Sequence, residues 1–167
     1  MLEVAIDTDG EWDSSTGWDG LARAAATAAI AESAFPQLGT SERIVELSIR
    51  LAGDAEVHAL NSKWRGKDKP TNVLSFPMAE SEELAEAAGL GPELMLGDII
   101  LARGVCAAEA EEKSIPLECH AAHLMVHGTL HLLGHDHLDE ADAADMEARE
   151  VRALARMGIA DPYEGDR

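Results

Sequence analysis

The sequence lacks long apolar runs and has little cysteine. No stretch of about 18 apolar residues occurs in its 167 residues, so a membrane-spanning helix is not expected. The first residues, MLEVAIDTDG, have no basic start followed by an apolar segment, so no signal peptide is predicted. The two cysteines, Cys106 and Cys119, have neither metal-site nor redox-motif spacing and make no disulfide framework. These absences predict a cytoplasmic protein without membrane association.

Basic residues are also scarce. Lys and Arg number 13 against 32 Asp and Glu, a net charge of −19, which argues against nonspecific binding to a polyanion. The ranges 79–94 and 139–150 are strongly acidic, with five and six acidic residues and at most one basic residue each. The range 61–78 is the exception, because four basic residues against one acidic residue leave a net +3. Any anion site is therefore expected in this range, with its basic residues Lys63, Arg65, Lys67 and Lys69; the acidic residue is Asp68.

The spacing of apolar residues predicts one α+β domain over residues 1–167. Alternation of apolar and polar residues predicts strands at 1–7, 43–53, 71–78 and 94–102. Helices are predicted at 18–35, 54–66, 105–114, 117–133 and 139–157. Asp54 is expected to be the N-cap of its helix, and Gly66 to end it. Because strands gather early and helices late, we expect a mixed sheet of about four strands packed with helices.

Residues 127–137, HGTLHLLGHDH, contain four of the seven histidines. His127 and His131 are four residues apart in a predicted helix, so both imidazoles project from the same face. Gly134 can end this helix in a left-handed conformation, after which His137 can fold back beside the other two. Three nitrogen ligands with an open fourth position are typical of a catalytic zinc site, here at the end of a long core helix.

His123 offers a rival triad together with His127 and His131. The outer two of these residues are about 12 Å apart along the axis at 1.5 Å per residue, whereas ligands of one zinc lie about 2 Å from the ion. The three cannot bind one ion, so His123 is expected to support a ligand or to pack in the core. His58 and His120 are assigned structural roles. His135 is a weak ligand candidate, because it is expected to point away if His137 turns in.

The histidine spacing matches the metzincin pattern H-E-x-x-H-x-x-G-x-x-H, except that Gly128 stands where those peptidases have glutamate. In the peptidases this glutamate accepts the proton of the metal-bound water. A metal can lower the pKa of bound water to about 7 without it. The site is therefore predicted to remain hydrolytic, while the case for a peptidase weakens.

Three blocks of the sequence resemble the YbeY-type bacterial endoribonucleases, also called rRNA maturation factors. The longest block, AHLMVHGTLHLLGHDH (122–137), is close to the family signature H-G-x-L-H-L-x-G-Y-D-H, with His135 where the family usually has tyrosine. The other two blocks follow the family order: NSKWRGKDKPTNVLSFP (61–77) and LGDIIL (96–101). The acidic segment 79–94 looks like a variable insertion.

The resemblance implies a zinc-dependent, single-strand-specific endoribonuclease acting in 16S rRNA 3′-end maturation and ribosome quality control. It implies a zincin-like fold with one Zn²⁺ per chain, held by His127, His131 and His137. A metal-activated water would attack the phosphodiester while Arg65 contacts the phosphate. The expected partners are single-stranded RNA or rRNA, the small ribosomal subunit and a basic ribosomal protein.

Arg65 also suits this chemistry on physical grounds, because a planar guanidinium can hold two phosphoryl oxygens as negative charge develops. The neighbouring lysines could guide an RNA backbone. Trp64 is expected to be buried rather than to stack on a base. Asp136 either orients a ligand imidazole or is a surface residue at the helix end, and both interpretations stay open.

Two other functions also stay open: a metallopeptidase with an unrecognised base, and a noncatalytic ribosome-assembly factor with a structural metal. Zinc-dependent cleavage of unfolded protein, with RNA left intact, would favour the first. The open coordination position argues against the second, whereas the negative charge argues mildly for it.

Overall fold

The fold is built on a four-stranded mixed sheet, seen in a computed structural model that describes residues 1–13, 16–86 and 91–164. The strand order is β1-β2-β4-β3. Strands β1 (Leu2–Thr8), β2 (Val45–Ala52) and β4 (Leu94–Ala102) run parallel, and β3 (Val73–Pro77) lies antiparallel to β4 at the edge. The predicted α+β class and mixed sheet are therefore confirmed.

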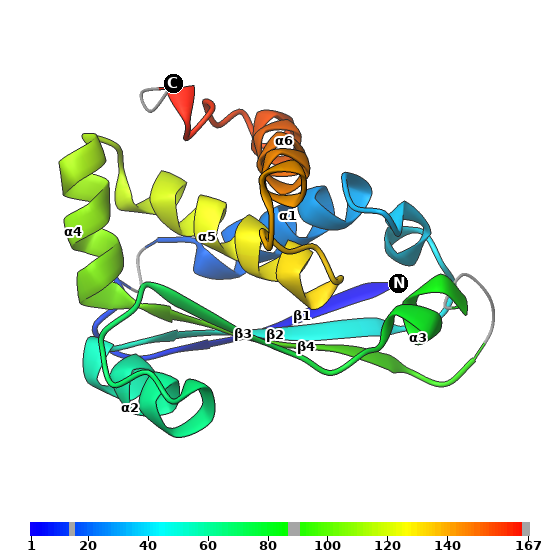
Figure 1. Ribbon diagram of the computed structural model, residues 1–167, viewed down its shortest axis with the longest axis horizontal. Helices are drawn as coiled ribbons and strands as arrows, with labels where there is room; N and C mark the ends of the chain where they lie inside the picture. Colours follow the sequence, from blue (N-terminus) through cyan, green and yellow to red (C-terminus); the bar gives the residue numbers. More distant parts are fainter. Residues whose placement is uncertain (14–15, 87–90, 165–167) are drawn as a thin grey trace.

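The helices divide unequally between the two faces of the sheet (Figure 1). Helix α5 (Leu117–Leu132) crosses one face, and α1 (Trp18–Ala31), α4 (Arg103–Lys113) and α6 (Glu140–Arg156) accompany it there. Helix α2 (Asp54–Arg65) lies against the opposite face. Two short elements lie in the connections: the 3₁₀ helix η1 (Pro36–Gly39) and α3 (Ser81–Glu86). The site described below is therefore carried by the more heavily covered face.

Helix α5 is the centre of the larger core. Eleven of its sixteen residues are buried, as expected of a helix that is apolar nearly all round. It packs tightly on the sheet at Gly128, where an added Cβ would lie 2.8 Å from Cγ2 of Ile99 in β4. A side chain at this position would force Ile99 or the helix to shift. The core beneath the histidine motif thus depends on glycine.

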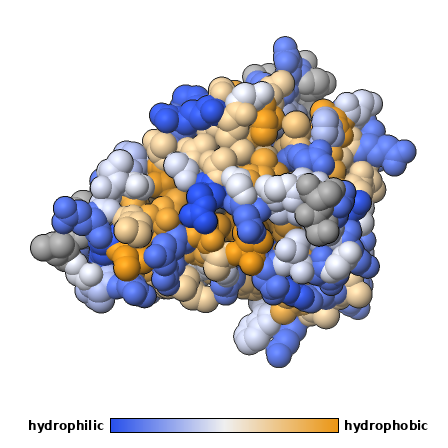
Figure 2. All heavy atoms as spheres, turned by 180° about the vertical axis from the view of Figure 1, so that it is seen from behind, coloured by the Kyte–Doolittle hydropathy of each residue, from blue (hydrophilic) through white to orange (hydrophobic). Residues whose placement is uncertain are grey.

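The face that carries α2 is only partly covered. A hollow of about 570 Å³ remains there, with a largely apolar lining that includes Ile6, Phe76 and Ile100. Trp64 borders this hollow and is 62% exposed, so the prediction of a buried Trp64 is wrong. The reason is that α2 is too short to close over the sheet. From behind, apolar side chains also reach the surface across the middle of the molecule (Figure 2).

Two predicted helix ends differ from the structure. The first predicted helix, 18–35, ends at Ala31, because the Ser33 hydroxyl donates to the Ile30 carbonyl and accepts from the Phe35 N–H, which diverts the backbone. The N-cap of α2 is Gly53 rather than Asp54. Gly66 does end α2 in a left-handed conformation, with φ of 66°.

The remaining predicted elements are present with ends shifted by at most two residues, and the cysteines are free thiols. The acidic segment 79–94 contributes α3 and the first residue of β4, and its residues 87–90 lie outside the described residues. In the described part of the chain, no helix combines the length and the apolar character that a membrane crossing requires.

Candidate metal centre

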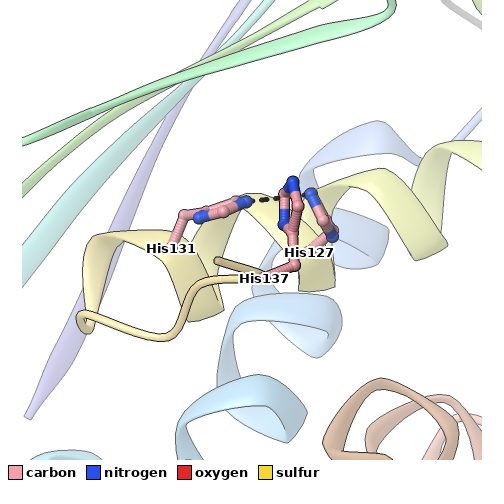
Figure 3. Close-up of side chains that lie close together, drawn as sticks. All are labelled: His127, His131 and His137. Carbon is pink, nitrogen blue, oxygen red and sulfur yellow. Dashed lines mark hydrogen bonds between the residues drawn. The ribbon is translucent and has the colours of Figure 1, made fainter. Parts of the chain in front are cut away.

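Three histidines converge near the end of α5 (Figure 3). The Nε2 atoms of His127 and His131 are 3.0 Å apart, as expected for residues one helical turn apart. The helix ends at Leu132, and Gly134, with φ of 88°, turns the chain so that His137 comes back toward the pair. The ring centroid of His137 is 6.0 Å from that of His127 and 5.3 Å from that of His131.

The spacing of these side chains fits one metal ion. One nitrogen from each histidine lies within 4.8 Å of the others. Two nitrogens that are each about 2 Å from a tetrahedral ion lie about 3.3 Å from one another, so small rotations of the three rings would bring all of them into range. Imidazole donors suit Zn, Cu, Fe and Ni. The residues His127, His131 and His137 can therefore hold a transition metal.

The electrostatics of His131 favour metal binding. Burial, followed by the proximity of His127, lowers the pKa of His131 to about 4. Its imidazole is therefore neutral near pH 7, and a neutral imidazole keeps the lone pair that a metal needs. His137 is different, because 59% of its side chain is exposed, so the centre opens to solvent on that side.

Behind the triad lies a buried carboxylate that the sequence did not single out. Glu150 of α6 is 1% exposed, and its Oε1 is 3.4 Å from Nδ1 of His127. Burial by itself raises the pKa of Glu150, but the hydrogen bonds from His123 and His127 outweigh it and hold the pKa at about 2. A sequence signal existed, since Glu150 falls at helical spacing on the buried stripe of α6 with Met146 and Leu154.

His123 does not join the triad. It is 7% exposed, and its Nε2 is 2.6 Å from Oε1 of Glu150. His135 also turns away, with its Nε2 accepting a hydrogen bond from the N–H of Ala34. His58 and His120 are paired elsewhere, with Asp68 and Glu109.

Asp136 contacts the backbone of the loop that carries the third histidine, His137. Its Oδ1 accepts a hydrogen bond of 2.8 Å from the backbone N–H of His137 and lies 3.7 Å from Nδ1 of that residue. Asp136 therefore shapes the turn that returns His137, although the side chain itself is about half exposed.

Arg65 lines the same cleft as the histidines. The cleft has a volume of about 710 Å³ and lies beside the edge strand β3. Arg65 is the last residue of α2; its Nη2 donates a 2.5 Å hydrogen bond to the carbonyl of Ser75, and its guanidinium stands 5.6 Å from the centre of the Phe76 ring. Arg65 and the triad, which are more than 60 residues apart in the sequence, thus meet at one site.

The lysines near Arg65 separate into two groups. Lys67 and Lys69 line the cleft, whereas Nζ of Lys63 stands 5.0 Å from the ring of Trp64 on the outside of α2. The basic stretch that stood out in the composition therefore borders the histidine centre, with Lys63 as the exception.

Comparison with known proteins places the chain in a family context. The sequence model described as Endoribonuclease YbeY matches residues 16–158. Proteins named Endoribonuclease YbeY from Novosphingobium aromaticivorans and Erythrobacter litoralis are 54% and 52% identical, over 96% and 99% of this chain and 95% and 98% of theirs. The solution structure of TM1509 from Thermotoga maritima has the same fold, with a TM-score of 0.57 at 20% identity over 93% of this chain and 92% of that one.

Proposed function

The chain belongs to the YbeY endoribonuclease family, and on that premise we propose that it is a zinc-dependent endoribonuclease specific for single strands. Its proposed task is the maturation of the 16S rRNA 3′ end and ribosome quality control. The observation that carries the proposal is the cleft in which Arg65 and three convergent histidines meet. The choice of rRNA and of single strands follows the family resemblance.

The histidine triad is proposed to hold one zinc ion per chain. When bound, zinc supplies Lewis acidity, which acidifies water and polarises a phosphoryl oxygen. The chain supplies three imidazole donors and leaves the exposed side next to His137 for substrate and water. An open position of this kind is the mark of a catalytic rather than a structural zinc site.

Arg65 is proposed to hold the phosphate. A guanidinium has five N–H donors, and the Ser75 carbonyl takes a hydrogen bond from one of its nitrogens, Nη2. This bond anchors the side chain at the cleft wall and leaves donors for phosphoryl oxygens, on which negative charge develops during cleavage. Lys67 and Lys69, on the same cleft, supply further positive charge along the path of the backbone.

The proposed partners of the protein follow from its net charge. A chain with a net charge of −19 repels RNA at long range, so its basic cleft attracts RNA only at short range. We infer that the small ribosomal subunit presents the RNA and that a basic ribosomal protein binds the acidic surface. This proposal places the protein in the cytoplasm.

The decisive experiment couples metal analysis of the purified protein with cleavage assays on single-stranded and duplex RNA bearing the 16S 3′ precursor sequence. We expect about one zinc per chain and cleavage of the single strand alone. Zinc-dependent cleavage of unfolded protein with intact RNA would establish a peptidase instead. A protein that binds zinc and the subunit but cleaves neither substrate would be an assembly factor.

A further inference from the structure

Glu150 is a charged group in an apolar setting. It lies on the inner face of α6 among Met146, Ala153 and Leu154, all of which are buried. Burying an unpaired carboxylate costs several kcal/mol, so such a residue is tolerated only with close partners. The partners of Glu150 therefore indicate what it does.

Two histidines of α5 and a tyrosine that follows α6 surround one oxygen of this carboxylate. Oε1 of Glu150 lies 2.6 Å from Nε2 of His123, 2.8 Å from Oη of Tyr163 and 3.4 Å from Nδ1 of His127. Tyr163 and His123 also contact each other, with 3.1 Å between Oη and Nε2 and the rings edge to face at 5.3 Å. Glu150 is thus held in place by His123 and Tyr163, and it faces His127.

The contact with His127 has a chemical consequence. An ionised carboxylate only accepts hydrogen bonds, so its position 3.4 Å from Nδ1 favours the tautomer of His127 that carries the proton on Nδ1. The Nε2 atom is then bare, and Nε2 is the atom directed at His131 and the proposed metal position. The hydrogen bond at one ring nitrogen decides which nitrogen is left to bind a metal.

We propose that Glu150 is a positioning residue that fixes the tautomer and ring orientation of His127, with His123 and Tyr163 as its anchors. The inference rests on the proposed metal site, because it explains why His127 presents Nε2 rather than Nδ1 to the metal. It also gives a role to the segment after α6, because Tyr163 joins a helix of the core to the back of the metal centre.

The test uses Glu150→Met, which removes the acceptor while keeping an apolar stripe, and Glu150→Gln, which keeps one carbonyl oxygen. Zinc affinity, measured by competition with a chromophoric chelator, should fall about 10- to 100-fold in Glu150→Met and less in Glu150→Gln. Tyr163→Phe should give a smaller loss in the same direction. The matched control is Glu147→Gln, an exposed position on the same helix, which should bind zinc like the unmodified protein.

A second measurement does not depend on metal. In the metal-free protein with ¹⁵N-labelled histidine, long-range proton–nitrogen spectra should show His127 protonated at Nδ1, and Glu150→Met should shift it toward protonation at Nε2. Unchanged tautomer and unchanged zinc affinity in a folded Glu150→Met protein would overturn the inference. Failure of the unmodified protein to bind zinc would instead overturn the proposed function, while the tautomer would still report on Glu150.

Discussion

At the scale of single residues, the site depends on side chains of quite different exposure that meet at one point. His131 is buried enough to lower its pKa to about 4, whereas most of the His137 side chain is open to solvent. His127 and His131 are half-buried on one helix, which would hold them in place around a metal, and the exposed His137 leaves room for substrate. The residues can therefore be tested one by one.

Replacing a ligand should remove the metal. His127→Ala, His131→Ala and His137→Ala should each lose most of the bound zinc, because each removes one of only three protein donors. His135→Ala is the control, since the ring of His135 accepts a hydrogen bond from the N–H of Ala34, and this variant should keep the full metal content. The measurement is zinc per chain after gel filtration. Full occupancy in the His137 variant would show that the third ligand is wrongly assigned.

Arg65 should matter for cleavage but not for metal. A guanidinium stays protonated and does not coordinate zinc, so Arg65→Ala should leave zinc content and thermal unfolding near those of the unmodified protein. RNA cleavage should fall about 10²-fold or more, the scale for losing one preorganised donor. Arg65→Lys should recover only part of the rate, since it keeps the charge and loses the two-pronged geometry. Cleavage by Arg65→Ala at the native rate would contradict the assignment.

Gly128 should matter for the stability of the fold, and restoring a glutamate there should not restore a catalytic base. Gly128→Ala places a Cβ against buried Ile99, and the free energy of unfolding should fall by about 1–3 kcal/mol. Gly128→Glu should be less stable still and should not cleave casein. In a double-mutant cycle the cost of Gly128→Ala should shrink when Ile99 is already Ala. Equal costs in both backgrounds would mean that the contact with Ile99 is not the cause.

At the scale of elements, the carboxylate of Asp54 links α2 to the N-terminal end of α4. The N-cap residue of α4, Ala102, has no side-chain oxygen, and Asp54 of α2 supplies the missing acceptor. Its Oδ1 accepts hydrogen bonds of 2.8 Å and 3.1 Å from the N–H groups of Gly104 and Val105. Asp54 thus caps a helix other than its own, and it ties α2 to the end of β4.

Removing this cap should weaken the fold. Asp54→Ala should lower the free energy of unfolding by about 0.5–2 kcal/mol, the usual cost of losing an N-cap acceptor, and urea titration measures the change. Glu112→Ala, an exposed change on α4 itself, is the control and should have little effect. Since Asp54 lies outside the cleft, zinc content should not respond to either variant. A fully stable Asp54→Ala protein would show that water serves the two N–H groups equally well.

At the scale of the whole molecule, the metal centre lies at the border of the core rather than inside it. The larger core is made of apolar residues from α1, α5, α6 and the sheet, and the three histidines are not part of it. Chelation should therefore abolish RNA cleavage while the far-ultraviolet circular dichroism stays unchanged. Thermal unfolding should shift only by the amount expected from losing a ligand of the native state. Loss of helix signal on chelation would indicate a structural metal.

Local features of the sequence determined most of the architecture. The alternation in 43–53, the four-residue spacing of His127 and His131, and the left-handed glycine after them act over a few residues. A reader of the sequence can therefore predict the strands, the long helix and the convergence of three histidines. The positive charge of the stretch around Arg65 can likewise be predicted, because it follows from the amino-acid composition.

Only the tertiary structure decided which distant residues meet. Asp54 caps α4 across fifty positions, Glu150 faces His127 from another helix, and Trp64 is exposed because α2 covers only part of its sheet face. Gly128 is explained by its contact with Ile99 rather than by the spacing of the motif. None of these contacts leaves a repeating pattern in the sequence. Each depends on how complete helices and strands pack against one another, which is decided only in the folded structure.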